Sequence, residues 1–525
     1  MATGISRRSF VSAAAACTIG TAGAAAIRTA HAEEGTVPPA WDSTVPEQWD
    51  REAQIVVLGC GIAGACGAVE AYDLGLDVLV VNAASDITDC CCTLSGGALC
   101  GYNSSLQQEA GIEDSAELMI ADIKADGRDM GDPEVIRAFV DLSGETIDWL
   151  EDLGCDVNEL VTLSSPSHSV ARTHNSFPSG NGLGWMEGLK GAIEERGIEL
   201  MADTYARKLY RDADGVVVGT HVETKDGQEM NVRATQGVLL AVGGLGNNYD
   251  LWDQYCLPFK EIKANAKKIL SGGPAEVSGD GYRMLEEING YCYPTPPNYG
   301  GGGVAVSNDG PASGILLPYT WKASVVEVNA EGKRFNNEAS FHEFYDVAMP
   351  LKQPGMWHVC IFDEKARTSP DGEIKAQPII DKALENGIES VKQADTIEEL
   401  AEMFGLPVDE VVKSVEEFNT YVENGGADEF GRDAWEGEKI ATPPFWGVEE
   451  NVIVATSKGG SRINAQAQVL DRHNQVIPHL YAAGEVAFFP VFGDANQHLV
   501  GGCNAVGANF GRIAARNIAN EEPLA

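Results

Sequence analysis

The sequence has little positive charge. Its 37 Lys and Arg residues stand against 78 Asp and Glu residues, and the formal net charge is −41. A surface of this sign repels the phosphate backbone of nucleic acids. We therefore expect no nucleic-acid partner, and a neutral substrate or a small basic carrier fits the charge better.

Long apolar runs are also missing. After residue 32 no segment reaches the roughly 18 uninterrupted apolar residues that a membrane span needs, so we expect no membrane span in the mature protein. Residues 6–11 (SRRSFV) precede a small, weakly apolar stretch that ends in an A-x-A-like site at residues 30–32. This pattern is typical of a twin-arginine signal peptide and predicts export to the periplasm or the extracytoplasmic cell surface.

Cysteine motifs for haem or zinc are absent. The chain has 12 cysteines, but it contains neither a C-x-x-C-H haem attachment site nor a paired C-x-x-C pattern. Most of the cysteines are expected to serve as small buried apolar residues. The run at residues 90–92 is unusual, and the sequence assigns it no role.

Four glycine-bearing segments are present instead, spread over most of the chain: residues 59–64 (GCGIAG), 95–97 (SGG), 241–244 (AVGG) and 483–485 (AGE). The first lies within residues 54–81, which read as strand, glycine turn, helix and strand. Glycine lets the backbone approach a pyrophosphate closely at a helix N-terminus. The order of strand, glycine turn, helix and strand therefore predicts a βαβ dinucleotide-binding unit. In this unit Asn82 takes the place of the usual ribose-binding acid.

The remaining pattern predicts an α/β fold that is interrupted. Helical spacing at residues 133–153 and 182–197 and short β-type runs from 199 to 240 complete a first part. From about 290 to 449 the texture changes to loops rich in Pro and Gly, one β-hairpin and several amphipathic helices. We predict a Rossmann-like domain interrupted by an inserted α+β capping domain, in the order signal peptide 1–32, linker 33–50, first Rossmann-like part 51–290, capping domain 291–449 and second Rossmann-like part 450–525.

Further motifs give the chain a family likeness. They are residues 328–338 (VNAEGKRFNNE), 395–401 (DTIEELA), 480–485 (LYAAGE), 501–505 (GGCNA) and 510–514 (FGRIA). Together with the glycine segments, they make the chain resemble the superfamily of soluble fumarate reductases and 3-ketosteroid dehydrogenases from about residue 52 to 520. The resemblance implies an FAD cofactor and an oxidoreduction at a CH–CH bond.

The resemblance also implies which residues hold FAD. Gly59, Gly61 and Gly64 would place the pyrophosphate at a helix N-terminus. Glu485 would hold the ribityl chain, and the start of the last helix would direct its positive dipole end at the flavin's pyrimidine oxygen. The full expected set is Gly59, Gly61, Ile62, Ala63, Gly64, Asn82, Ser95, Gly96, Gly97, Ala241, Gly243, Gly244, Glu485, Gly502, Asn504, Ala505 and Val506.

The catalytic slot departs from the family pattern. Four residues after the last glutamate of the hairpin the family has a proton-donating arginine or a tyrosine, and this chain has His342. Histidine can protonate a carbon that receives hydride, or it could pack in the hairpin–helix junction. Tyr345 and His498 are candidate orienting groups. Arg172 and His174 resemble a family segment near flavin and substrate, and the alternative for them is a polar loop below the cofactor.

The cations that clamp a dicarboxylate in fumarate reductases are replaced here. Pro318 and Trp321 precede the hairpin, Thr456 stands near the place of a histidine, and residues 497–500 (QHLV) replace an arginine. A desolvated dicarboxylate needs paired cationic partners. We therefore expect a substrate that is larger and less charged than fumarate, such as an aromatic or polycyclic molecule.

Three functions are compatible with this pattern. The first is an exported FAD reductase that adds hydride and a proton across an activated C=C bond of an enoate or enone. The second is a ketosteroid-like dehydrogenase that runs the chemistry in reverse, and the third is a member that binds flavin or ligand without catalysis. We favour the first, with electrons from a separate donor such as a cytochrome or a quinol-linked carrier, because the chain has no second GxGxxG unit and no haem site.

Overall fold

The computed structural model describes residues 41–155, 157–161, 168–176, 182–295, 299–305, 314–316, 324–338, 351–368, 377–385, 387–432, 438–454, 456–493 and 499–524. The expected signal peptide and residues 33–40 of the predicted linker lie outside these residues. So do the three candidate catalytic residues His342, Tyr345 and His498.

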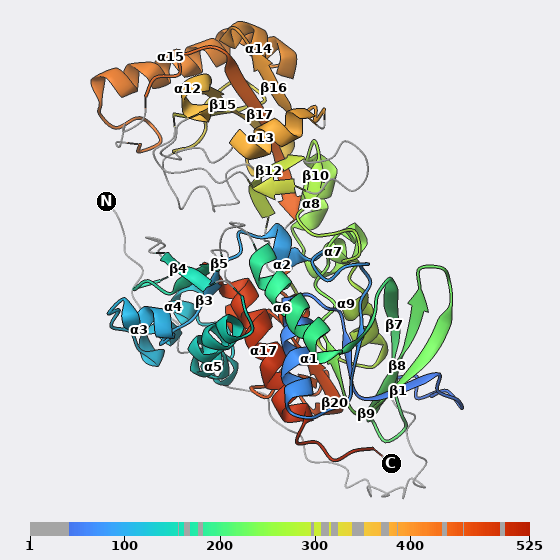
Figure 1. The fold of residues 1–525 in the computed structure, drawn as a ribbon. Coiled ribbons are helices and arrows are strands. Elements are labelled where there is room, and N and C mark those ends of the chain that lie inside the picture. The colour runs from blue at the N-terminus through green and yellow to red at the C-terminus, as the bar shows by residue number, and fades with distance from the viewer. Residues whose placement is uncertain are drawn as a thin grey trace, which may run out of the picture. The chain divides into compact units, whose positions relative to one another are not determined.

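The first sheet has eight strands and a parallel centre (Figure 1). Strand β1 pairs in parallel with β2 on one side and with β9 on the other, β6 continues beyond β2, and β20 continues beyond β9. Parallel strands that are covered on both faces carry continuous apolar runs, as β2 does here. This sheet confirms the predicted α/β class. Its path runs through β19 (Gln468–Leu470), β20 (Val476–Ala482), β9 (Glu229–Leu240), β1 (Arg51–Leu58), β2 (Val78–Val81) and β6 (Glu199–Met201).

An antiparallel ribbon extends from this sheet. Strands β7 (Thr204–Arg211) and β8 (Val217–Thr224) pair with each other, and β8 pairs with β9. The turn between them is closed by Asp212, whose side chain accepts hydrogen bonds from the backbone N–H groups of Asp214 and Val216. The short β-type runs predicted between residues 199 and 240 are confirmed.

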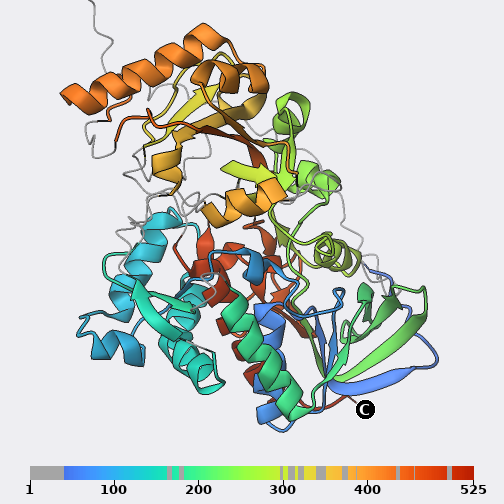
Figure 2. The ribbon, with the colours of Figure 1, turned by 45° about the horizontal axis from the view of Figure 1, so that its top comes forward.

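Helices α1 (Ile62–Asp73) and α17 (Gly502–Ile518) lie side by side against the first sheet (Figures 1 and 2). Glycines allow this approach, because a Cβ at Gly511 would overlap the carbonyl oxygen of Ala63. A Cβ at Gly67 would lie 3.1 Å from the carbonyl oxygen of Gly511. The first and last helices of the Rossmann-like part are thus held together by backbone-to-backbone contact.

The helices predicted at residues 133–153 and 182–197 are confirmed as α5 (Pro133–Asp152) and α6 (Leu183–Arg196). Asp132 caps α5 by accepting hydrogen bonds from the backbone of Glu134 and Val135, and Pro133 occupies the first helical position. Other elements of this region are α2 (Cys91–Leu94), β3 (Leu99–Cys100), α3 (Ser105–Glu109), α4 (Ala116–Asp126), β4 (Val157–Val161), β5 (Thr173–Ser176), α7 (Tyr249–Tyr255), α8 (Phe259–Asn265), α9 (Asp280–Glu287) and β11 (Cys292–Tyr293). Towards the C-terminus lie β18 (Gly460–Ser461), η2 (Gly484–Val486) and α16 (Phe489–Phe492).

The second sheet has seven strands. They are β10 (Ile269–Ser271), β12 (Tyr299–Ala305), β13 (Gly314–Leu316), β14 (Val326–Asn329), β15 (Trp357–Asp363), β16 (Val391–Ala394) and β17 (Phe445–Val454). Its helices are η1 (Pro354–Met356), α12 (Glu364–Arg367), α13 (Gln377–Glu385), α14 (Ile397–Phe404) and α15 (Val408–Asn424).

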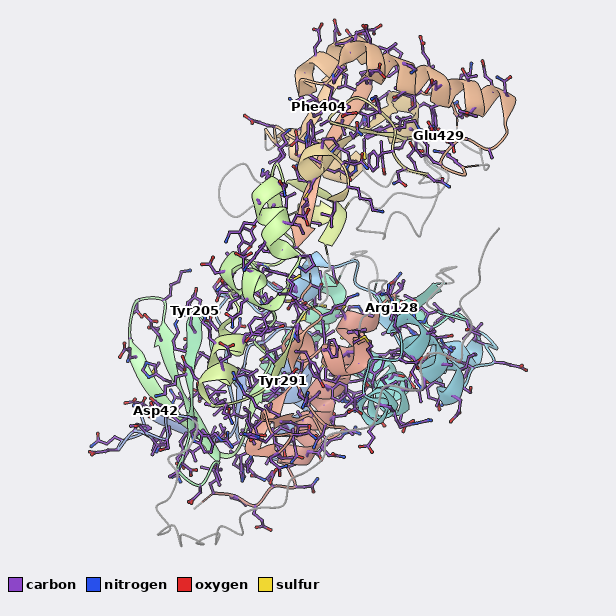
Figure 3. All side chains as sticks on the ribbon, turned by 180° about the vertical axis from the view of Figure 1, so that it is seen from behind. Asp42, Arg128, Tyr205, Tyr291, Phe404 and Glu429 are labelled. Carbon is purple, nitrogen blue, oxygen red and sulfur yellow. The ribbon has the colours of Figure 1, made fainter. Side chains whose placement is uncertain are left out.

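The second sheet is buried on both faces. One core includes Val359, Leu400 and Phe404, the residue labelled at the end of α14 in Figure 3, and the other includes Cys360 and Phe362. Strand β14 and a bridge between Val328 and Arg334 form the predicted hairpin. No helix among the described residues has the length and apolar character that crossing a membrane would require.

Candidate active site

The turn between β1 and α1 shows why each of its glycines is needed. Gly59 has φ = +90°, and its N–H donates to the carbonyl oxygen of Val81 at 2.7 Å. A Cβ at Gly59 would overlap the backbone of Ala241, and a Cβ at Gly64 would overlap the carbonyl of Gly59. Gly61 differs, because its Cβ would meet only Cys90 Cβ, at 3.9 Å. The space beside Gly61 is therefore open for a ligand to approach the backbone.

A cavity lies along this turn, and its empty volume, which includes space open to solvent, is about 1130 Å³. Ten of the residues predicted to hold the cofactor line it: Gly59, Gly61, Ile62, Ala63, Asn82, Ser95, Ala241, Gly243, Glu485 and Asn504. The other seven do not line it: Gly64, Gly96, Gly97, Gly244, Gly502, Ala505 and Val506.

Several lining residues escaped the sequence analysis. They include Thr204, Tyr205 and Ala206 at the start of β7, Pro274, Glu276 and Val277 in the loop before α9, Asp280, Phe488, and five cysteines at positions 60, 90, 91, 92 and 503. Tyr205 is labelled in Figure 3. The residues of β7 and of the loop carry no motif that could have marked them. The cysteine run was visible in the sequence, but only the fold brings it to the cavity wall.

Asn82 lines the cavity at the end of β2. Its side-chain oxygen accepts a hydrogen bond from the N–H of Cys60 at 3.0 Å, and its amide donates to the carbonyl oxygen of Ala84 at 3.0 Å. Its own carbonyl accepts from the N–H of Thr204 at 2.9 Å. An amide can donate and accept at once, whereas an ionised carboxylate only accepts. The side chain of Asn82 thus joins the glycine turn to the carbonyl of Ala84, a donation that an ionised acid could not make, while the link to β7 is a backbone bond.

Ser95 and Asn504 join two distant segments at the cavity. The amide of Asn504 donates to Ser95 Oγ at 3.0 Å and to the carbonyl oxygen of Ala98 at 3.3 Å. Ser95 Oγ also accepts from the N–H of Gly97 at 3.1 Å, and the carbonyl of Gly97 accepts from the indole N–H of Trp185. The SGG segment is therefore fixed against the first turn of α17.

Glu485 is held by Ser457. Its Oε1 accepts from the backbone N–H of Ser457 at 2.7 Å and from its hydroxyl at 3.0 Å. A Cβ at Gly244 would overlap this carboxylate and the Ser457 hydroxyl, so Gly244 makes room for the pair without lining the cavity itself. Burial raises the pKa of Glu485 to about 7, and the two hydrogen bonds from Ser457 oppose the shift.

The N-terminus of α17 also reaches the cavity. Gly501 precedes it with φ = +77°, and a Cβ there would lie 2.6 Å from the backbone nitrogen of Cys100. Cys503 and Asn504 in the first turn line the cavity. The first turn of a helix carries a partial positive charge, which favours an anionic ligand group nearby.

A lysine that the sequence analysis did not single out lies close to this turn. Lys458 is buried, burial lowers its pKa, and the nearby groups Cys503 and Asp126 oppose the shift. Burial in turn raises the pKa of Asp126 to about 6, against the attraction of Lys458. Lys458 Nζ lies 5.8 Å from the centre of the Phe492 ring. It does not line the cavity.

Arg172 and His174 belong to a buried polar loop. Arg172 Nε and Nη2 each donate to Asp114 at 2.6 Å, and Nη1 donates to Asp122. His174 Nε2 lies 2.7 Å from Ser104 Oγ, and burial lowers the pKa of His174 to about 4. Neither residue lines the cavity, which favours the polar-loop alternative.

The parallel sheet, the glycine turn and the cavity along it define a dinucleotide-binding flavoprotein. The family described as FAD binding domain matches residues 54–510, and the chain belongs to this family. Its cofactor is FAD.

Known proteins agree with this class. Probable fumarate reductase Ifc3 of Shewanella frigidimarina is 29% identical over 472 residues, which are 89% of this chain and 74% of that protein. Vinyl phenol reductase of Lactiplantibacillus plantarum is 26% identical over 490 residues, which are 89% of this chain and 96% of that protein. The solved open conformation of a flavocytochrome c3 fumarate reductase is 28% identical, with a TM-score of 0.76, over 90% of this chain and 78% of that one. The chain is therefore an FAD-dependent reductase of activated C=C bonds that acts on a small organic molecule.

Proposed function

We propose that this reductase is exported and reduces the C=C bond of an enoate or enone that is larger and less charged than fumarate. We assign His342 as the proton donor and Tyr345 and His498 as the residues that orient the substrate. The observation that carries the proposal is the FAD cavity at the glycine turn, together with the replacement of the dicarboxylate-clamping cations in the sequence.

The residues around the cavity fit FAD. Gly61 leaves room for a pyrophosphate against the backbone, and the N-terminus of α17 would offer its positive dipole end to the flavin. Asn82 would lie beside the adenosine ribose and Glu485 beside the ribityl chain. FAD bound here supplies the hydride that adds to one carbon of the double bond.

The second carbon needs a proton, and a histidine can donate it. The segment that carries His342 begins directly after Glu338, whose position is well fixed. Arg334 Nε and Nη2 donate to the Glu338 carboxylate at 2.8 and 2.7 Å, and Arg432 Nη1 donates to it at 3.1 Å. This buried cluster fixes Glu338, which stands four residues before His342 in the sequence. Donation by an imidazolium leaves a neutral histidine, which solvent or a neighbouring acid reprotonates.

The sequence supports a substrate with little negative charge. The positions that clamp a dicarboxylate in the resembled fumarate reductases are replaced by uncharged residues, and one of these, Thr456, lines the cavity. A doubly charged acid would lack the paired cations that it needs when it is desolvated. The likeness to a protein named vinyl phenol reductase is consistent with an aromatic substrate without a dicarboxylate.

The reaction can be tested with the FAD-loaded protein. After anaerobic reduction of the flavin, a panel of enoates, enones and cinnamate-like compounds is added, and the return of oxidised-flavin absorbance is followed. We expect rapid reoxidation by an aromatic or polycyclic member and slow reoxidation by fumarate. If fumarate is the fastest acceptor, the substrate class is wrong. If reduced ketosteroids instead reduce the oxidised flavin, the enzyme works as a dehydrogenase.

The proton donor is tested in the same assay with His342→Ala. General acid catalysis contributes about a hundredfold or more, so the variant should reoxidise about a hundredfold more slowly while it still binds FAD. His473→Ala is the matched control, because His473 is exposed. A rate within about twofold of the unmodified protein would remove His342 from the mechanism.

Export is proposed from the twin-arginine pattern, and a separate donor is proposed as the source of electrons. Replacing Arg7 and Arg8 together by Lys should retain the FAD-loaded protein in the cytoplasm, as measured by cell fractionation. Arg28→Lys serves as the control and should be exported normally. Export of the double variant at an unchanged level would contradict this route.

A further inference from the structure

The second sheet contains a buried polar cluster that no part of the flavin chemistry uses. Side chains alternate between the two faces of a strand. On β15, Val359 and Ile361 belong to one apolar core, while Cys360 and Phe362 belong to the core on the opposite face. His358 shares the second face with Cys360, because the two residues are two positions apart. This face is therefore apolar towards Phe362 and polar towards His358.

The neighbouring strands add two carboxylates to the polar end. In the register of the sheet, Glu327 of β14 pairs with Cys360, and Glu450 of β17 pairs with His358. Cross-strand partners have Cβ atoms about 5 Å apart, which brings their side chains together. One ligand atom each from Glu327, His358 and Cys360 lie within 4.8 Å of one another, and all three residues are buried.

Glu450 lies at the same place. Its Oε2 is 3.0 Å from His358 Nε2, and the side chains are 0% and 2% exposed. Despite this short distance, neither ring nitrogen of His358 and neither oxygen of Glu450 has a hydrogen-bond partner of acceptable geometry among the described residues. Buried polar groups are normally paired, and an isolated buried carboxylate is costly. These four atoms are therefore buried together without the hydrogen bonds of good geometry that such groups normally make.

The types of side chain in this cluster indicate which kind of ligand it would bind. A thiolate, an imidazole and carboxylates within one small volume are the ligands of zinc and similar divalent transition metals. When deprotonated, two carboxylates and a thiolate carry three negative charges, and a divalent cation would offset two of them at this buried site. Among the described residues this is the one group of three or more such ligands with this spacing.

We propose that Glu327, His358 and Cys360 bind a divalent transition metal, zinc in the first place, with Glu450 beside His358 as a further carboxylate of the site. The metal joins β14, β15 and β17, so its role is to hold the second sheet together. This inference does not depend on the proposed substrate or on His342, because its readout is metal binding and not turnover.

The test uses tag-free, FAD-loaded protein after dialysis against a weak chelator. Co²⁺ is then titrated, and its ligand-field bands are followed in the red, where oxidised flavin does not absorb. We expect about one equivalent of Co²⁺ per chain, bound in tetrahedral geometry and displaced by Zn²⁺. Cys360→Ser, which nearly preserves the volume, should weaken binding at least tenfold and shift the bands, and His358→Ala should do the same.

Cys155→Ser is the matched control, since Cys155 is also buried but lies outside the second sheet. It should bind Co²⁺ as the unmodified protein does. A second measurement protects against a variant that folds poorly: Zn²⁺ should raise the unfolding temperature of the unmodified protein and of Cys155→Ser, but not that of Cys360→Ser. Binding of less than a tenth of an equivalent by the unmodified protein, or unchanged binding by Cys360→Ser, would overturn the proposal.

Discussion

At the scale of single residues, Gly244 shows how a motif glycine can act without touching the cavity. Its hydrogen atom faces the Glu485 carboxylate and the Ser457 hydroxyl, and a methyl group would overlap both. Gly244→Ala should displace Glu485 and weaken FAD binding by about tenfold or more, because a shift of about an ångström disrupts a built site. The dissociation constant for FAD, measured by flavin fluorescence, checks this.

The control for this substitution is Gly191→Ala in α6. A Cβ at Gly191 meets no heavy atom within 4 Å, so alanine there should leave FAD binding unchanged. It should stabilise the helix by up to about 1 kcal/mol. An unchanged FAD affinity in Gly244→Ala would show that Glu485 does not depend on this space.

Glu485 itself predicts a pH dependence of stability. Burial raises its pKa in the folded protein to about 7 from an ordinary value of 4.5. Between these values the folded state holds a proton that the unfolded state has lost, so stability falls as pH rises through this window, by up to about 1.4 kcal/mol per pH unit. Urea unfolding of the FAD-free protein should show this slope, and Glu485→Gln should have a smaller one.

Asp126 contributes a slope of the same sign, because burial also raises its pKa, to about 6. The test therefore compares the pH dependence of the free energy of unfolding in the unmodified protein with that in Glu485→Gln. It does not require that the variant have no pH dependence. Identical slopes for the two would show that Glu485 is not the group that titrates.

At the scale of elements, the contact between α1 and α17 decides whether the cavity keeps its shape. Gly511 lies against the backbone of Ala63, one helical turn from residues that line the cavity. Gly511→Ala should push the helices apart and lower the free energy of unfolding by about 1–3 kcal/mol, the range for overpacking. Chemical denaturation measures it, with Gly191→Ala again as the control. A loss below about 0.5 kcal/mol would mean that the two helices separate without strain.

At the scale of the whole molecule, the net charge of −41 sets how an electron donor approaches. A small basic carrier would be attracted over a long range, and salt screens this attraction. We expect the second-order rate of flavin reduction by a basic cytochrome to fall by at least about tenfold between low and high ionic strength. Stopped-flow measurement checks this, with a neutral chemical reductant as the control. A rate that does not change with salt would exclude electrostatic steering.

Much of the fold could be predicted because its signals are local. The strand–turn–helix at residues 54–81, the helices α5 and α6 and the glycine motifs each follow from residues close together in the chain. The cofactor set was predicted by resemblance, and seven of its residues prove to lie away from the cavity wall. Gly64 and Gly244 belong to the motifs because they allow close packing behind the site. A sequence motif does not show whether a glycine serves packing of this kind or contact with a ligand.

Other features depend on segments that meet only in space. Thr204 lines the cavity at the start of β7, where its N–H donates a hydrogen bond to the carbonyl oxygen of Asn82. Lys458 lies near Cys503 of α17, although the two residues belong to different parts of the chain. Glu327, His358 and Glu450 are spread over more than a hundred residues and meet through the register of three strands. The register between strands that are far apart in the chain cannot be predicted from a local sequence pattern.

The sequence by itself determined the class of this protein. A backbone that must approach a pyrophosphate needs glycine at set spacings, and these spacings can be recognised without knowledge of the rest of the fold. Only the tertiary structure decided which of those glycines face the cavity and which make room behind it. It also decided that a histidine, a cysteine and two glutamates from three strands share one buried volume. The physical reason is that strand pairing and helix packing join residues far apart in the chain, and burial then sets what their side chains can bind.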